Sequence, residues 1–127
     1  MDNATLFAFA NTVGQRAGLA SIETQADQKS IDTARSLTSD KSDLATAMVL
    51  VARGYSNTLF TNKADCRCFA TLAGRLLYKH RHGDKPTIDD VDYECQAHLY
   101  HLIVPTDIRQ KAHKWVNNML FNPLEVN

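Results

Sequence analysis

Cysteine and histidine side chains gather in the second half of the chain, where their types would suit a zinc site. The residues in question are Cys66, Cys68, His80, His82, Cys95, His98 and His101. Zinc in proteins takes four ligands in a tetrahedral arrangement. Cys66 and Cys68 are two positions apart, so on a helix they point about 200° away from each other and cannot both face one ion. We therefore predict no metal site. The alternative is a zinc site in which Cys95, His98 and His101 supply two or three of the ligands.

The same side chains do not form a pattern typical of an enzyme. Nucleophilic catalysis by cysteine requires a thiolate beside a histidine that a third group orients. All three cysteines fall in segments with helical periodicity, and the chain has no glycine-rich phosphate loop, no Gly-x-Ser-x-Gly sequence and no His-Glu-x-x-His sequence. An acidic run that magnesium could use begins with two helix-capping residues: Asp89, Asp90, Asp92 and Glu94. We expect no catalytic residue, no cofactor and no enzyme activity.

Basic residues cluster in the segment RLLYKHRHGDK, residues 75–85, and recur near the C-terminus. The chemistry that they offer is attraction to phosphate. The candidate basic patch consists of Arg75, Lys79, Arg81, His82, Lys85, Arg109, Lys111 and Lys114. A local explanation competes with it, since a positive side chain in the last turn of a helix is favourable by about 0.3–1 kcal/mol. Nucleic-acid binding by a regulator is therefore the alternative function.

Composition indicates a globular protein in a reducing compartment. The 127 residues are 44% hydrophobic, and 14 Lys and Arg balance 14 Asp and Glu. Zero net charge argues against bulk attraction to nucleic acid or to a membrane, and no apolar run approaches the ~20 residues that span a bilayer. An odd number of cysteines without a secretory leader favours free thiols. We predict a cytoplasmic protein, located in the host cytoplasm or the virion if it is viral.

The elements that position these residues are predicted to be helices. Strand-like alternation and hairpin signals are absent, and apolar residues recur at helical spacing. The expected bounds are 4–17, 21–37, 40–53, 63–82, 88–104 and 107–119. We predict an all-α fold, a compact bundle of five or six helices, in a single domain over residues 1–127.

Caps and stops define these helices. The predicted N-caps are Asn3, Ser21, Ser39 or Asp40, and Thr87, of which Thr87 forms an imperfect capping box with Asp90. The predicted stops are Gly54, Gly83 and Pro105. The last helix is expected to bury Ile108, Ala112, Trp115, Val116 and Met119.

The segment 88–104 is apolar on two sides when drawn as one helix. One side carries Ile88, Val91, Cys95, His98, Leu99 and Leu102, and the other carries Tyr93, Ala97, Tyr100 and Val104. Such a helix is either central in its domain or covered by a partner. Tyrosine is common at interfaces because it combines apolar area with a polar tip. The second side is therefore the candidate protein interface.

Residues 69–104 loosely resemble the helical lid of AAA-type ATPases, through a short turn that leads into a helix capped by Thr87 and continued by Asp90 and Val91. The same turn is similar to the last part of a histone fold. The ATPase core that such a lid serves is absent, because no Walker motif occurs, and we claim no family. The architecture is similar to that of small head–tail adaptor proteins of tailed phages.

We predict a non-enzymatic protein that works through protein–protein contact, as a homo-oligomer or with another partner. A phage or mobile-element origin would suit a short helical chain without motifs. Inhibition of a host protein and a structural or assembly role both fit this prediction.

Overall fold

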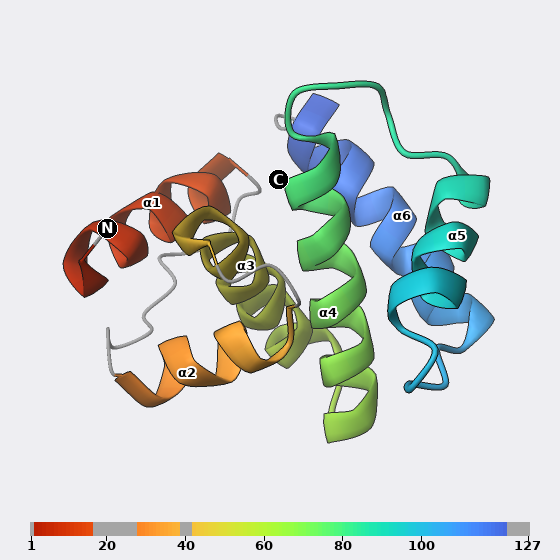
Figure 1. Cartoon of the computed structure of the whole chain (residues 1–127), viewed down its shortest axis with the longest axis horizontal. Helices are drawn as coiled ribbons and strands as arrows, with labels where there is room; N and C mark the ends of the chain where they lie inside the picture. The colour runs from red at the N-terminus through yellow and green to blue at the C-terminus, as the bar shows by residue number, and fades with distance from the viewer. Residues whose placement is uncertain (1, 17–27, 39–41, 122–127) are drawn as a thin grey trace.

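The computed structural model describes residues 2–16, 28–38 and 42–121 (Figure 1). In these residues the fold is all-α, as predicted, and contains no strand. The helices are α1 (Asn3–Arg16), α2 (Gln28–Ser36), α3 (Asp43–Leu59), α4 (Lys63–His80), α5 (Ile88–His98) and α6 (Thr106–Phe121). No helix among the described residues combines the length and the apolar character needed to cross a membrane.

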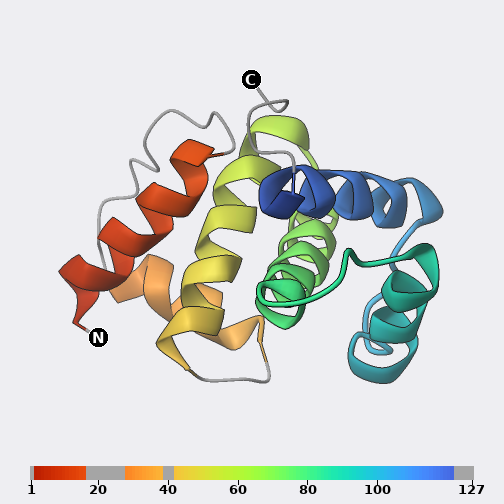
Figure 2. The ribbon, with the colours of Figure 1, turned by 90° about the horizontal axis from the view of Figure 1, so that it is seen from above.

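Helices α3 and α4 pack against each other at the centre of the bundle (Figure 1). On one side, α1 and α2 cover α3; on the other side, α6 and α5 lie against α4. Viewed from above, α5 lies at the edge of the molecule opposite α1, beside one end of α6 (Figure 2). The sequence allowed this helix to be either central in its domain or covered by a partner. Its place at the edge excludes the central position.

The core is centred on an aromatic cluster from α3, α4 and α6. Phe69 is fully buried, and its ring centroid lies 5.6 Å from those of Tyr55 and Phe60 and 5.5 Å from that of Trp115. The five α6 residues predicted to be buried are all in the core. This agreement follows from a regular apolar stripe, which fixes the inward face of a helix before its neighbours are known.

The first three helices start or end differently from the predictions. The cap of α1 is Asp2, whose Oδ1 accepts the amide of Thr5 at 2.8 Å, and not Asn3. The cap of α3 is Ser42 instead of Ser39 or Asp40. The predicted Ser21 cap and the start of the segment 21–37 lie outside the described residues.

Gly54 does not stop α3, which continues to Leu59. Glycine costs about 1 kcal/mol inside a helix. The residues that follow compensate, because Tyr55 stacks on Trp115 at 5.0 Å and Ser56 is buried. Tertiary packing therefore overrides the local stop signal.

The connection between α4 and α5 combines a confirmed cap with a different stop. Thr87 caps α5, and Asp90 completes the box by accepting the Thr87 amide at 2.8 Å. Helix α4 ends at His80 with Arg81 as its C-cap, so Gly83 is not the C′ residue.

Helix α5 ends at His98, well before the predicted stop at Pro105. Leu99 leaves the helical conformation with φ −120° and ψ 22° and is buried, as is Val104. Pro105 instead directly precedes α6, and its carbonyl oxygen accepts the amides of Ile108 and Arg109, both at 3.1 Å. The chain leaves the helix early because a straight continuation would not bring both Leu99 and Val104 into the core.

Candidate functional site

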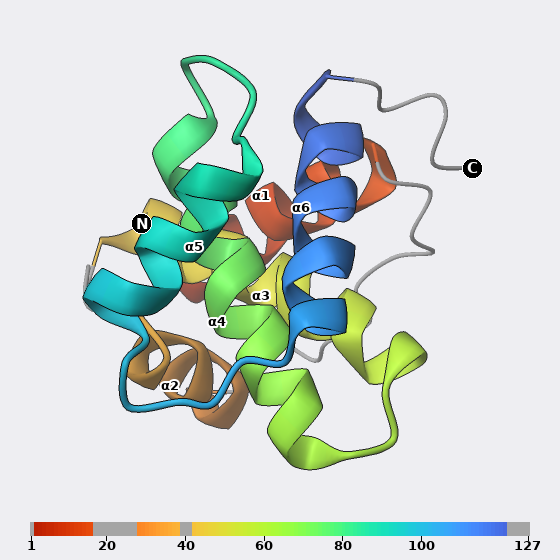
Figure 3. The same ribbon diagram turned by 90° about the vertical axis from the view of Figure 1, so that its right-hand side faces the viewer.

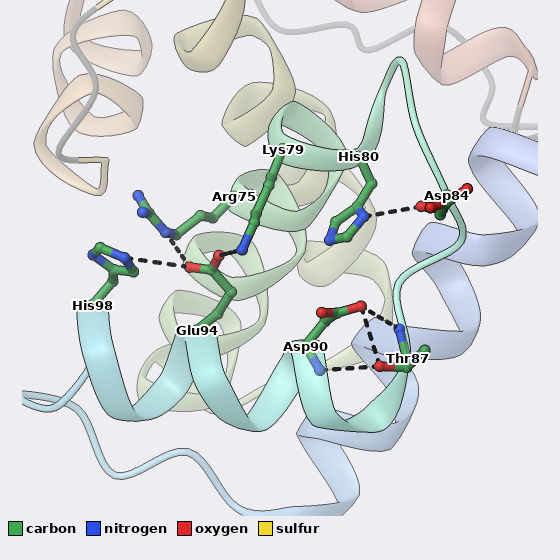
Figure 4. A network of polar contacts seen from close by, with 8 residues as sticks. All are labelled: Arg75, Lys79, His80, Asp84, Thr87, Asp90, Glu94 and His98. Atoms are coloured by element: carbon green, nitrogen blue, oxygen red, sulfur yellow. Dashed lines mark hydrogen bonds and ion pairs between the residues drawn. The ribbon is translucent and has the colours of Figure 1, made fainter.

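A buried carboxylate joins α5 to α4. The Glu94 side chain is only 1% exposed, and it accepts hydrogen bonds from Arg75 Nε and from Lys79 Nζ, the latter at 2.9 Å. His98 Nε2 lies 4.0 Å from the same carboxylate, one turn further along α5. Figure 4 shows the three side chains converging on Glu94 from two helices. We call Glu94, Arg75, Lys79 and His98 the Glu94 cluster.

The electrostatics of the Glu94 cluster favour a charged carboxylate. Burial raises the pKa of Glu94, but hydrogen bonds from Lys79 and Arg75, together with their charges, outweigh burial and hold that pKa below its usual range. A general acid or base needs a pKa near the working pH and a free oxygen. Both Glu94 oxygens are already bonded, so the arrangement suits a structural role.

The Glu94 cluster corrects two sequence-based assignments. Glu94 was grouped with an acidic run that magnesium could use, and Arg75 and Lys79 with the candidate basic patch, yet Glu94 pairs with both cations between α4 and α5. A signal was present in the sequence, because Glu94 follows Val91 by three residues and precedes Cys95, and both neighbours are buried. An acid on a buried face requires a cationic partner.

Most of the other predicted basic residues are also held by the fold. Arg109 bonds Asp92 Oδ1 at 3.1 Å, and Lys111 lies 3.9 Å from Asp107. Two more lie over aromatic rings: Arg81 is 4.0 Å from the Tyr78 ring centroid and Lys85 is 5.6 Å from that of Phe121. His82 and Lys114 are exposed. Six of the eight predicted residues therefore make contacts within the fold, at several separate places.

Three of the four residues of the predicted interface are exposed, and the fourth is buried. Tyr93 and Tyr100 are 56% and 81% exposed, and Ala97 is exposed. Val104 is a correction, since it is 5% exposed and belongs to the core. The helix ends before Tyr100, so a single helical face cannot hold these four residues. The structure adds Ile103, which is 92% exposed and which helical periodicity missed.

The loop between α5 and α6, visible in Figure 3, is held in place by hydrogen bonds within the loop and from α4 and α6. The Leu102 amide bonds the Leu99 carbonyl at 2.8 Å, and the Cys68 thiol bonds the Ile103 carbonyl at 3.5 Å. Arg109 Nε bonds the Val104 carbonyl at 3.0 Å. The backbone that carries Tyr100 and Ile103 is thus fixed while both side chains face outward.

The three cysteine side chains have packing roles. Burial raises the pKa of Cys68 and of Cys95, which keeps both protonated and unreactive at neutral pH. Cys66 donates toward the carbonyl oxygens of Ser56 and Phe60. Within the described ranges, no three side chains of the kinds that hold a metal come together.

Comparison with protein-family models, curated proteins and solved structures finds no significant match to the chain.

Proposed function

We propose that the protein acts without catalysis, by binding another protein through the edge formed by α5 and the loop after it. The observation that carries the proposal is the exposure of Tyr93, Tyr100 and Ile103. We call these three residues and Ala97 the α5 edge surface.

The α5 edge surface has the composition of a protein contact. Large apolar side chains rarely gather on an exposed surface unless they bind something, and tyrosine is enriched among residues that dominate binding energy. Tyr100 and Ile103 are the most exposed of the large hydrophobic residues in the described part of the chain. Tyr93 extends the same region back along α5.

The hydrogen bonds that hold the loop between α5 and α6 lower the entropic cost of binding. Association is weakened when a contact segment must be ordered. Here the backbone bonds of Leu102, Ile103 and Val104 already fix the loop. Tyr100 and Ile103 are therefore presented by a rigid support.

Two forms of this function fit the surface: inhibition of a host protein, and an assembly role that includes self-association of the chain. Light scattering of the purified protein separates them, since self-association doubles the mass or more. The nucleic-acid alternative is less favoured, because Arg75 and Lys79 of its basic patch are bound to Glu94.

The test is quantitative affinity purification from the native cell with the double variant Tyr100→Asp/Ile103→Asp. Leu59→Asp is the matched control, because Leu59 is also a large exposed hydrophobic residue but lies at the end of α3. We expect partner proteins to be recovered with wild type and the control and lost with the double variant. Equal recovery in all three would refute the proposal.

A further inference from the structure

A groove winds along the length of α4. It consists of three adjoining hollows, with volumes of about 540, 220 and 440 Å³. The first and second share Thr38, Arg75 and His98, and the second and third share Leu37 and Arg67. The shared lining makes the three hollows one continuous depression along α4, bordered by residues of α2, α3 and α5.

The floor of the groove is a regular stripe of α4. Five residues spaced four apart line it: Lys63, Arg67, Thr71, Arg75 and Lys79. Residues spaced by four are neighbours on a helix surface, and each step turns about 40° around the axis, so this row winds about 160° around α4 between Lys63 and Lys79. At 1.5 Å per residue the row is about 24 Å long. The groove therefore offers a positive side chain at almost every turn.

The groove is strongly positive although the chain as a whole is neutral. Among the described residues, its lining contains one acid, Glu94, against five basic side chains: Arg53, Lys63, Arg67, Arg75 and Lys79. Glu94 is occupied by Arg75 and Lys79. The other three basic residues make no salt bridge within the part of the chain that the structure describes. Charge is thus concentrated at the end of the groove remote from Glu94.

The lining is also partly apolar. Leu37, Phe60 and Leu102 are half-buried and open onto the hollows. Apolar side chains of a bound peptide would pack against these residues. A sugar–phosphate backbone has no such side chains. The mixture of positive and apolar lining is complementary to a segment that mixes acidic with apolar residues.

From this charge and lining we propose that the groove binds an acidic segment of the partner protein, one that also carries apolar side chains. The inference rests on the proposed function, in which the partner is a protein. At about 3.3 Å per residue, an extended segment of roughly seven residues would fill the groove. Tyr93, Glu94 and His98 of α5 form its wall, so the groove is continuous with the α5 edge surface.

The test begins with selection of random 12-residue peptides displayed on phage against the immobilised full chain. Binding of the enriched peptides is then measured by fluorescence anisotropy with wild type and with Lys63→Glu/Arg67→Glu. Both residues are exposed and lie outside the Glu94 cluster, and circular dichroism verifies that the variant is folded. Lys114→Glu, an exposed residue of α6 that lines none of the three hollows, is the matched charge control.

We expect the selected peptides to be rich in Asp and Glu with interspersed apolar residues. Their affinity should fall about tenfold or more in the double variant and stay within about twofold in Lys114→Glu. Failure to enrich peptides, enrichment without acidic bias, or equal loss in the control would overturn the inference.

A labelled 20-nucleotide single strand and the matching duplex serve as competing ligands. Binding of either that depends on Arg67, with no peptide enriched, overturns the inference in favour of a nucleic acid. The proposed function is judged separately by Tyr100→Asp/Ile103→Asp in the native cell. Loss of the partner there, combined with no effect of Lys63→Glu/Arg67→Glu, would remove the groove and leave the α5 edge surface standing.

Discussion

The centre and the edge of this bundle are built on different principles. At the centre, α3, α4 and α6 enclose Phe69 in aromatic and aliphatic contacts. At the edge, α5 is attached to α4 by a buried ion cluster, and α5 and the loop after it each carry an exposed tyrosine. Burial of apolar area stabilises the first region, whereas the second leaves such area in water. The contrast agrees with the proposal that the centre supplies most of the stability and the edge the binding surface.

The most damaging change is expected at the centre, with Phe69→Ala. Removing a fully buried ring leaves a cavity and should lower the free energy of unfolding by about 3–5 kcal/mol. Urea denaturation measures this loss. Leu59→Ala is the control, since Leu59 is partly exposed, and its effect should be near zero. A loss below 1 kcal/mol at Phe69 would show that the core is centred elsewhere.

Glu94→Gln probes the link between the two regions. It leaves Arg75 and Lys79 without their anion, and we expect a loss of about 2 kcal/mol at neutral pH. Asp92→Asn is the control on the same helix, because Asp92 is exposed and its pair with Arg109 is at the surface. That variant should lose less than about 1 kcal/mol.

The effect of Glu94→Gln should depend on pH. The pKa of Glu94 is lowered in the folded protein, so its contribution is complete above the ordinary glutamate pKa and is lost as pH falls through the folded value. The difference between wild type and variant should therefore shrink from about pH 4 downward. A difference that stays constant from neutral to acidic pH would contradict the charged cluster.

Gly74→Ala tests how closely α3 and α4 approach. A Cβ at this position would lie 2.7 Å from Val49 Cγ2 and 2.9 Å from Val49 Cα. Overpacking should cost about 1–3 kcal/mol, more than the ~1 kcal/mol of helix propensity gained. Gly83→Ala is the matched control, because a Cβ there meets nothing within 4 Å. Thermal unfolding that ranks the two variants equally would exclude the close contact.

The smallest effect on folding is expected at the edge. Tyr100→Asp should change the free energy of unfolding by no more than about 0.5 kcal/mol, as is usual for exposed positions. Urea denaturation measures it beside Phe69→Ala. Loss of the helical circular dichroism signal in Tyr100→Asp would show that this residue supports the fold and not a contact.

Local sequence signals predicted much of the centre and also the start of α5 at the edge. The apolar stripe of α6 identified Trp115 and its buried neighbours, and the Thr87 box began α5 as expected. These features depend on residues within one or two turns of each other. Gly54 was misinterpreted because the contacts that carry α3 past it come from α6, far along the chain.

The edge was less predictable for the same reason. The end of α5 depends on Leu99 and Val104 turning into the core, and no local breaker marks it. The pairing of Glu94 with Arg75 joins residues 19 positions apart. The row of residues spaced four apart from Lys63 to Lys79 was visible in the sequence. The neighbouring helices that form the sides of the groove were not.

The central claim is that the α5 edge is where this protein meets its partner. The most direct measurement places a photo-crosslinking amino acid at position 100, and in a parallel sample at position 59, in the native cell. We predict a discrete adduct of higher mass from position 100 and none from position 59. No adduct from position 100, or the same adducts from both positions, would contradict the claim.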